Sequence, residues 1–381
     1  MNDVLIYADT LRSPELRHEI PAPIIDPFLY AECGGKPYAV LSQLDADGAR
    51  AARAGLQVLS PEALGLDELL AAGVDAEEAL IELSVKACLE IGVQQAIVPP
   101  GFPLELADQL RMKGLSLRVG REFFAARRRV KTPAELHGVR RALRAAEAGM
   151  EAAATLLRAA QIDHGTVLVH GRSLTCEEIK AAIRAAVTGS GAIAEDLIVS
   201  HGAQTAVGHD RGSGPIAPSE PIVIDLWPRD PVSGCFADMT RTFVIGEPGP
   251  EMTTWHGLCH EALQRAIQAV RPGVRGRDVY EVVCNVFQEA GHPTQLTKQP
   301  GETLRDGFFH ALGHGVGLEP HEAPNLGRSQ TDVIVAGDVL AVEPGLYRHG
   351  FGGCRLEDLV LVTDSGAELL TQYPYGLANG R

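Results

Sequence analysis

The sequence has few aromatic residues, a deficit of positive charge and no long apolar run. Aromatic side chains make up 5% of the 381 residues, and 34 Lys and Arg stand against 49 Asp and Glu, which gives a net charge of −15. Proteins that bind nucleic acids use basic patches for phosphates and aromatic rings for bases, so we expect no nucleic-acid partner. Because no stretch reaches about 18 consecutive apolar residues, we also expect no membrane-spanning helix.

Paired cysteine motifs are missing as well. The seven cysteines are odd in number and scattered, and none forms a Cys-x-x-Cys pair. The N-terminal residues show no basic head followed by an apolar run, so we expect no secretory signal. These absences disfavour a disulfide framework or a thiolate metal site, and they predict buried, reduced thiols in a cytoplasmic protein.

Two domains are expected from the order of the elements. Strand-like and helix-like segments alternate in the first third, which is typical of an α/β domain. The segment Thr132–Glu135 then offers an N-cap threonine, a proline and a glutamate, which predicts the start of a long helix. We therefore predict domains at 1–126 and 127–381. The basic run Arg127–Arg129 at their junction is interpreted as a solvated linker face.

Two aspartates interrupt apolar, strand-like segments. Asp225 follows a β-branched run, and Asp238 lies in Cys235–Phe243, with turn-forming residues between them. A hairpin would place the two carboxylates side by side, where they repel unless a proton or a cation lies between them. Alternatively, each accepts backbone hydrogen bonds or pairs with Arg241. From these two residues alone, both interpretations stay open.

Three histidines lie close together in a glycine-rich segment, His310, His314 and His321. A zincin helix requires Glu directly after its first His, whereas Ala311 follows here, and the surrounding glycines disfavour a helix. An extended segment of small residues would let His314 reach a metal ion. The clustering favours a functional role over a structural one.

Two glutamates complete the set, and each lies in an apolar strand-like segment. Glu343 alone is explained by a strand-end ion pair, and Glu357 by an ion pair with Arg355 on the same strand face. Combined with the earlier residues, they give four carboxylates and one imidazole, which suit two divalent cations such as Mn²⁺, Co²⁺ or Zn²⁺. Two ions about 3.5–4 Å apart activate water for hydrolysis. Serine-hydrolase and P-loop motifs are absent.

This set of residues resembles the pita-bread metallopeptidases of family M24, over about residues 130–370. The resemblance implies an α+β pita-bread (creatinase/aminopeptidase-like) catalytic domain behind a creatinase-like α/β N-terminal domain. It also implies two bound divalent metal ions, with manganese as the first expectation and cobalt or zinc next. Members are often dimers, so we expect a homodimer.

The resemblance assigns a role to each of the five expected metal ligands. Asp225 chelates one ion, Asp238 and Glu357 bridge both, and His314 and Glu343 bind the second. The two aspartates are two residues farther apart than in the family pattern. An insertion of two residues keeps the alternation of strand faces, so we expect a longer turn and a retained site.

Further residues are similar to those of the proline-directed branch, namely His209, His310, His321 and Arg355. The resemblance implies that His321 stabilises the oxyanion, while Glu343 carries a proton to the leaving nitrogen. His209 and His310 would line the proline side, and Arg355 would hold the carboxylates. The implied activity is an Xaa-Pro aminopeptidase that releases the N-terminal residue from proline-containing peptides.

Three alternatives stay open. One is a prolidase restricted to Xaa-Pro dipeptides, or a hydrolase of another small amide. A second is a creatinase-like enzyme without metal, which the complete ligand set disfavours. The third is a catalytically silent scaffold of the same fold that binds peptides or proteins.

Overall fold

The computed structural model describes residues 3–378, and the chain divides after Arg128 into two compact units. The predicted boundary lies two residues earlier. Of the helices in the described part of the chain, none is long and apolar enough to cross a membrane. All seven cysteines are free, and six of them are buried, as expected for reduced thiols.

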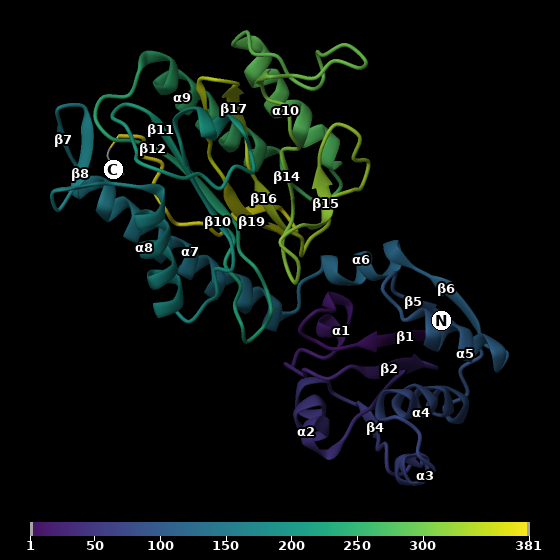
Figure 1. Cartoon of the computed structure of the whole chain (residues 1–381). Coiled ribbons are helices and arrows are strands. Elements are labelled where there is room, and N and C mark those ends of the chain that lie inside the picture. Colours follow the sequence, from purple (N-terminus) through teal and green to yellow (C-terminus); the bar gives the residue numbers. More distant parts are fainter. Residues whose placement is uncertain (1–2, 379–381) are drawn as a thin grey trace. The chain divides into compact units, whose positions relative to one another are not determined.

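The N-terminal unit is a mixed sheet with helices on both faces (Figure 1). The sheet order is β4-β3-β2-β1-β5-β6. Its strands are β1 (Asp3–Ala8), β2 (Phe28–Cys33), β3 (Lys36–Val40), β4 (Gln57–Leu59), β5 (Gln95–Val98) and β6 (Ser116–Val119). Its helices are α1 (Pro14–Glu19), α2 (Gln43–Ala52), α3 (Leu66–Ala71), α4 (Ala76–Glu90), α5 (Leu104–Met112) and α6 (Arg121–Arg129). Neighbouring residues of β1 belong to different cores, with Leu5 in one and Ile6 in the other, which confirms the α/β class.

The basic run at the junction is not a solvated linker face. It ends α6, and Arg127 makes ion pairs of 2.8 Å with both Glu19 and Glu32. Arg129 reaches Asp338, a carboxylate that is fully buried, at 2.6 Å. The prediction is therefore wrong, because these guanidinium groups are needed to neutralise buried carboxylates that lie far away in the sequence.

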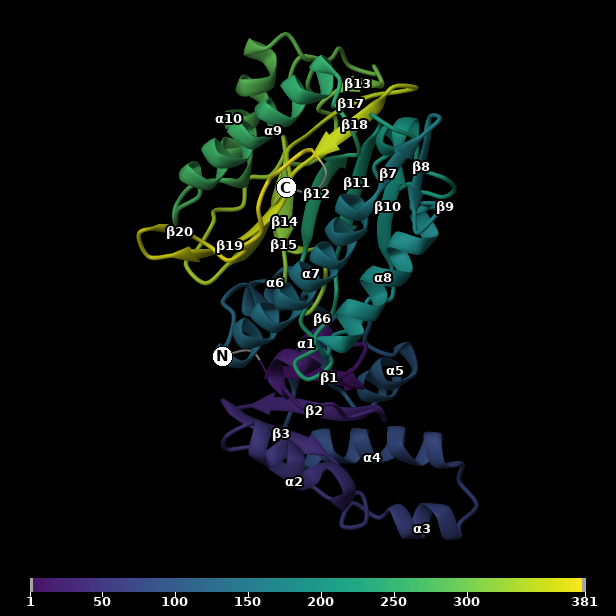
Figure 2. The same ribbon diagram turned by 90° about the vertical axis from the view of Figure 1, so that its left-hand side faces the viewer.

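The second unit contains four long helices and several small antiparallel sheets (Figure 2). The helices are α7 (Pro133–Ala159), α8 (Cys176–Gly189), α9 (Pro250–Ala269) and α10 (Gly276–Glu289), with a 3₁₀ helix at Gly202–Ala206. The strands are β7 (Gln161–Asp163), β8 (Thr166–Val169), β9 (Arg172–Ser173), β10 (Leu197–His201), β11 (Pro221–Leu226), β12 (Met239–Val244), β13 (Asp306–Gly307), β14 (Gly313–Gly315), β15 (Glu322–Leu326), β16 (Val339–Val342), β17 (Gly345–Arg348), β18 (Gly352–Arg355), β19 (Asp358–Thr363) and β20 (Gly366–Leu369). They pair in the orders β10-β11-β12, β15-β14-β16-β19-β20, β13-β17-β18 and β7-β8-β9.

Helix pairs cover the outer sides of these sheets and leave the inner sides for polar residues. The capping box at Thr132 starts α7 as predicted, and α7 and α8 pack on Ile222, Ile224 and Leu226 of β11. Because side chains alternate along a strand, Asp225 points away from these helices. In the same way, α9 and α10 pack on alternate residues of β16. The architecture is the pita-bread fold, as predicted.

Candidate metal centre

Asp225 and Asp238 share one face of the β10-β11-β12 sheet. Asp225 lies opposite Thr240 across the β11–β12 ladder. Asp238 precedes Thr240 by two residues and lies just before β12, so both carboxylates are on the same side, one step apart diagonally. The two aspartates were predicted to lie directly side by side in a hairpin. They are diagonal neighbours instead, because the pairing of β12 with β11 starts at Met239 and not at residue 235.

The turn between the two aspartates runs from the end of β11 to the start of β12 and is held by a third aspartate. Asp230 accepts hydrogen bonds from the backbone and hydroxyl groups of Ser233 at 2.8 and 2.6 Å. It also accepts hydrogen bonds from Nε and Nη2 of Arg141, a residue of α7, at 3.0 and 2.7 Å. These hydrogen bonds hold the middle of the turn and attach it to α7.

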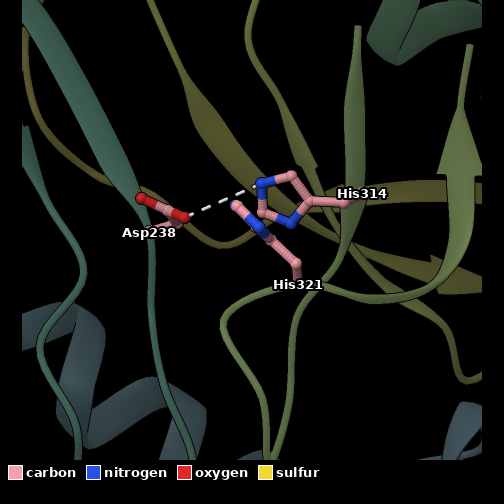
Figure 3. A group of neighbouring side chains, drawn as sticks. All are labelled: Asp238, His314 and His321. Atoms are coloured by element: carbon pink, nitrogen blue, oxygen red, sulfur yellow. Dashed lines mark ion pairs between the residues drawn. The ribbon is translucent and has the colours of Figure 1, made fainter. Parts of the chain in front are cut away.

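His314 presents an unprotonated nitrogen to two carboxylates. Its Nδ1 donates to the Gly315 carbonyl at 3.1 Å, so Nε2 carries the lone pair. That nitrogen lies 3.8 Å from Asp238 Oδ2 and 3.7 Å from Glu343 Oε1 (Figure 3 shows the first). Burial lowers the pKa of His314 to about 4, so the ring is neutral. A lone pair facing carboxylate oxygens fits a cation between them.

Glu343 and Glu357 lie at the ends of short strands beside these residues. Glu343 directly follows β16, and Glu357 lies between β18 and β19, where Thr240 Oγ1 donates to its Oε2 at 2.7 Å. Burial raises the pKa of Glu343 to about 8. Burial and the charges of Glu343 and Asp225 hold the pKa of Glu357 well above its usual value. The structure thus concentrates negative charge that is costly without a counterion.

The donor atoms form three overlapping groups, each with atoms within 4.8 Å of one another. The groups are Asp225, Asp238 and Glu357; His314, Glu343 and Glu357; and Asp238, His314 and His321. In addition, Asp225 Oδ1 is buried and makes no hydrogen bond to any of the described residues. Shared carboxylates and imidazole nitrogens are a donor set that suits a pair of divalent cations. The five predicted ligands are therefore brought together, and their chemistry fits the expected metals.

The other predicted residues line the same cavity, which has a volume of about 830 Å³. His209 lies on the segment before β11, and His310 and His321 flank β14. The His321 ring centre is 4.1 Å from that of His314, and both rings lie near Asp238 (Figure 3). Burial and the nearby His209 lower the pKa of His321, so this ring is a neutral hydrogen-bond donor and acceptor.

Arg355 is connected to His310 through a residue that sequence reasoning missed, Tyr347. Arg355 Nη2 donates to Asp225 Oδ2 at 2.6 Å, and its Nη1 donates to the Tyr347 hydroxyl at 3.2 Å. Because His310 Nδ1 donates to the Ala311 carbonyl at 2.6 Å, its Nε2 accepts from Tyr347 at 3.0 Å. Burial and Arg355 lower the pKa of His310 to about 3, so its ring is neutral. The hydrogen bonds therefore run from Arg355 to Tyr347 and from Tyr347 to His310.

Two glycines beside Tyr347, one on its own strand and one opposite it, were a signal that could have revealed it. A Cβ on Gly345 would lie 2.4 Å from the tyrosine hydroxyl, and one on Gly353 would lie 2.4 Å from its ring. The repeated glycines in these strands therefore make room for a large buried side chain. Other residues that sequence reasoning missed also line the cavity, including Asp196, Arg211, Trp227 and Phe309.

A buried ion pair lies next to His321 in the chain. Lys131, at the start of the second unit, binds Glu322, the residue after His321, and both side chains are 3% exposed. A Cβ on Gly317 would lie 2.6 Å from this carboxylate and 2.7 Å from the lysine stem, so the glycine leaves space for the pair. The pair therefore supports the loop between β14 and β15 that carries His321.

Replacing Lys131 with methionine is expected to lower the free energy of unfolding by about 3 kcal/mol, because it removes a cation from a buried carboxylate. Urea titration of the metal-free protein measures this change. Arg140→Met is the matched control, since Arg140 pairs with Glu368 at an exposed position of α7, where such pairs contribute about 1 kcal/mol or less. Equal effects of the two substitutions would contradict the assigned role of Lys131.

Comparison with known proteins agrees with this geometry. The model of metallopeptidase family M24 matches residues 137–364, which contain all five candidate ligands. An Xaa-Pro dipeptidase from Pyrococcus furiosus is 34% identical over 178 residues, 46% of this chain and 47% of that protein. An uncharacterized peptidase from Staphylococcus aureus is 39% identical over 137 residues, 36% of each chain. The aligned segments thus span less than half the length of these relatives.

Solved structures resemble the chain over nearly its whole length. An Xaa-Pro dipeptidase from Bacillus anthracis has a TM-score of 0.78 at 21% identity, covering 99% of this chain and 94% of that one. An X-Pro aminopeptidase from Thermotoga maritima has a TM-score of 0.76 at 20% identity, covering 98% and 97%. At these identities the likeness concerns the fold. Together with the family match over more than half of the chain, it shows that this protein belongs to metallopeptidase family M24.

Proposed function

We propose that this chain hydrolyses the peptide bond before proline in Xaa-Pro dipeptides. The observation that carries the proposal is the group of five ligand candidates, whose donor atoms lie close together in one cavity. Relatives named as Xaa-Pro dipeptidases move the proposal from the aminopeptidase first expected towards the dipeptidase. This choice concerns only the length of the substrate.

We assign the metal pair to Asp225, Asp238, His314, Glu343 and Glu357, with manganese first and cobalt or zinc next. Bound there, two divalent ions would polarise the scissile carbonyl and lower the pKa of a water molecule. Two observations support this assignment. Asp225 Oδ1 is buried without a hydrogen-bond partner among the described residues, and His314 Nε2 lies 3.8 Å from Asp238 and 3.7 Å from Glu343. A homodimer and a cytoplasmic location remain predictions.

The remaining residues bind and orient the substrate. His321 donates a hydrogen bond to the oxygen on which negative charge develops. Glu343 passes a proton to the departing proline nitrogen. His209 and His310 line the proline side of the cavity, and Tyr347 holds the His310 ring through its hydroxyl.

The test is cleavage of Xaa-Pro, Xaa-Pro-Yaa and Xaa-Ala peptides by protein loaded with Mn²⁺, with release of the free N-terminal residue as the readout. The proposal predicts the highest kcat/KM for the Xaa-Pro dipeptide and no turnover of Xaa-Ala. No cleavage of any proline peptide by fully loaded protein contradicts it. Metal analysis then distinguishes a silent scaffold, which would fold without binding metal.

Longer Xaa-Pro peptides are the second candidate. The cavity of about 830 Å³ is within the range that holds drug-sized ligands and offers more room than a dipeptide fills. Faster cleavage of the tripeptide than of the dipeptide would favour this aminopeptidase activity.

A further inference from the structure

The cavity contains two permanently charged cations among its described lining residues, Arg211 and Arg355. Arg355 is 5% exposed and its fork is committed to Asp225 and Tyr347. The Arg211 side chain is 63% exposed. It lies two residues after His209, on the same lining segment. Arg211 is therefore the cation that an incoming substrate meets.

One edge of the Arg211 guanidinium is held by Asp196. Nε donates to Asp196 Oδ1 at 3.1 Å and to Oδ2 at 2.8 Å, and Nη2 donates to Oδ2 at 2.5 Å. Asp196 is itself oriented by the Leu197 backbone N–H at 3.0 Å. A guanidinium has five N–H donors, and no hydrogen bond of Nη1 to any of residues 3–378 is observed. The edge formed by Nη1 and the second Nη2 proton is thus free and fixed in direction.

Asp196, which orients this edge, directly precedes β10, the strand that pairs with the strand of Asp225. Ile198 is directly opposite Asp225 in the β10–β11 ladder, and Asp196 comes two residues before Ile198. Both Asp196 and Ile198 line the cavity, so they share a face. Two residues of extended chain correspond to about 6.6 Å. In a dipeptide, a single proline residue separates the scissile bond from the terminal carboxylate. The length of this residue plus one hydrogen bond is similar to that distance.

Charge fixes the direction in which a dipeptide enters. Four carboxylates gather at one side of the cavity, where a substrate carboxylate is repelled unless it ligates metal. Arg211 also lines the cavity and offers two parallel N–H donors, the geometry that recognises a carboxylate. We propose that Arg211, oriented by Asp196, binds the free C-terminal carboxylate of the dipeptide and thereby selects dipeptides over longer peptides. This inference rests on the proposed function.

The test compares an Xaa-Pro dipeptide with its C-terminal amide, which differs only in the negative charge. Wild-type protein loaded with Mn²⁺ is expected to prefer the free acid by about tenfold in kcat/KM, the range of one charge-assisted contact at an exposed site. Arg211→Met is expected to abolish the preference by raising KM for the acid, while leaving the amide unchanged. Arg211→Lys retains part of the preference, because it keeps the charge and loses the fork.

Two further variants separate recognition from structure. Asp196→Asn keeps Arg211 and weakens its orientation, so KM for the acid rises and KM for the amide does not. Arg229→Met is the matched control, since Arg229 pairs with the neighbouring Glu195 at 3.3 Å outside the cavity, and it leaves the acid-to-amide ratio at the wild-type value.

The outcomes separate this inference from the proposed function. If wild type cleaves both compounds and Arg211→Met has the same acid-to-amide ratio, the role of Arg211 is overturned while the proposed function stands. If wild type cleaves neither compound nor any Xaa-Pro peptide, both are overturned.

Discussion

Replacing Asp238 with asparagine is expected to lower kcat/KM by at least about a thousandfold, because the carboxylate proposed to be shared by the two ions would act on both of them. The same substitution is expected to make the metal-free protein more stable. Burial and the charges of Glu357 and Asp225 hold the pKa of Asp238 well above its usual value, so keeping Asp238 ionised costs free energy in the folded state. Asparagine is nearly the same shape and carries no charge.

The difference in stability between wild type and Asp238→Asn depends on pH, because the pKa of Asp238 is higher in the folded than in the unfolded state. Below the ordinary carboxyl pKa, Asp238 is protonated in both the folded and unfolded states, so the two proteins have similar stability. As the pH rises above that value, the unfolded state releases the proton first and only the wild-type protein loses stability. Thermal unfolding of both metal-free proteins at pH 3 and pH 7 measures this. A higher stability of wild type at pH 7 would contradict the account.

Asp230→Asn is the matched control, an identical substitution at a buried aspartate of the same turn. Although burial opposes ionisation, hydrogen bonds from Arg141 and Ser233 hold the pKa of Asp230 below its usual value. Its negative charge therefore stabilises the fold, and the substitution is expected to lower the free energy of unfolding. The two aspartates should respond with opposite signs, and metal binding should be lost only at Asp238.

Replacing Arg355 with methionine is expected to destabilise the metal-free protein by about 3 kcal/mol, since it leaves buried carboxylates without their cation. Arg355 lies 2.6 Å from Asp225 and 3.9 Å from Glu343, and it is 5% exposed. Bound metal supplies positive charge at the same place, so the variant should gain more stability from Mn²⁺ than wild type does. Urea unfolding with and without Mn²⁺ measures both quantities.

Arg355→Lys provides the control for charge alone. Lysine keeps the cation near Asp225 and loses the planar fork that also reaches Tyr347. It should recover most of the stability, whereas activity should stay reduced by about 10–100-fold, as for other residues that orient metal ligands. If Arg355→Met were as stable as wild type without metal, the carboxylates would not need compensation and the electrostatic account would fail.

The ligand candidates could be predicted from sequence because burying a charged carboxylate in an apolar segment costs free energy. A carboxylate in or beside a buried strand needs a partner, and Asp225, Asp238, Glu343 and Glu357 all lie in such places. Their number was the signal, since ordinary ion pairs explain one or two of them. The structure brings these residues together as expected and retains the inward faces despite the longer turn.

Other features depend on contacts between distant segments, which local patterns do not reveal. The run Arg127–Arg129 has the composition of a solvated linker, yet its partners Glu19 and Asp338 lie more than 100 and 200 residues away. Tyr347 looks like one more strand residue until Gly353 is placed opposite it. Arg211 is an ordinary loop cation until the cavity wall is assembled around it.

The most direct test of the central claim is a calorimetric titration of the metal-free protein with Mn²⁺, checked by elemental analysis of the loaded protein. The account predicts two ions per chain for wild type and fewer than two for Asp238→Asn, with the Asp230→Asn control unchanged at two. A wild-type protein that is folded and binds no divalent ion would contradict it.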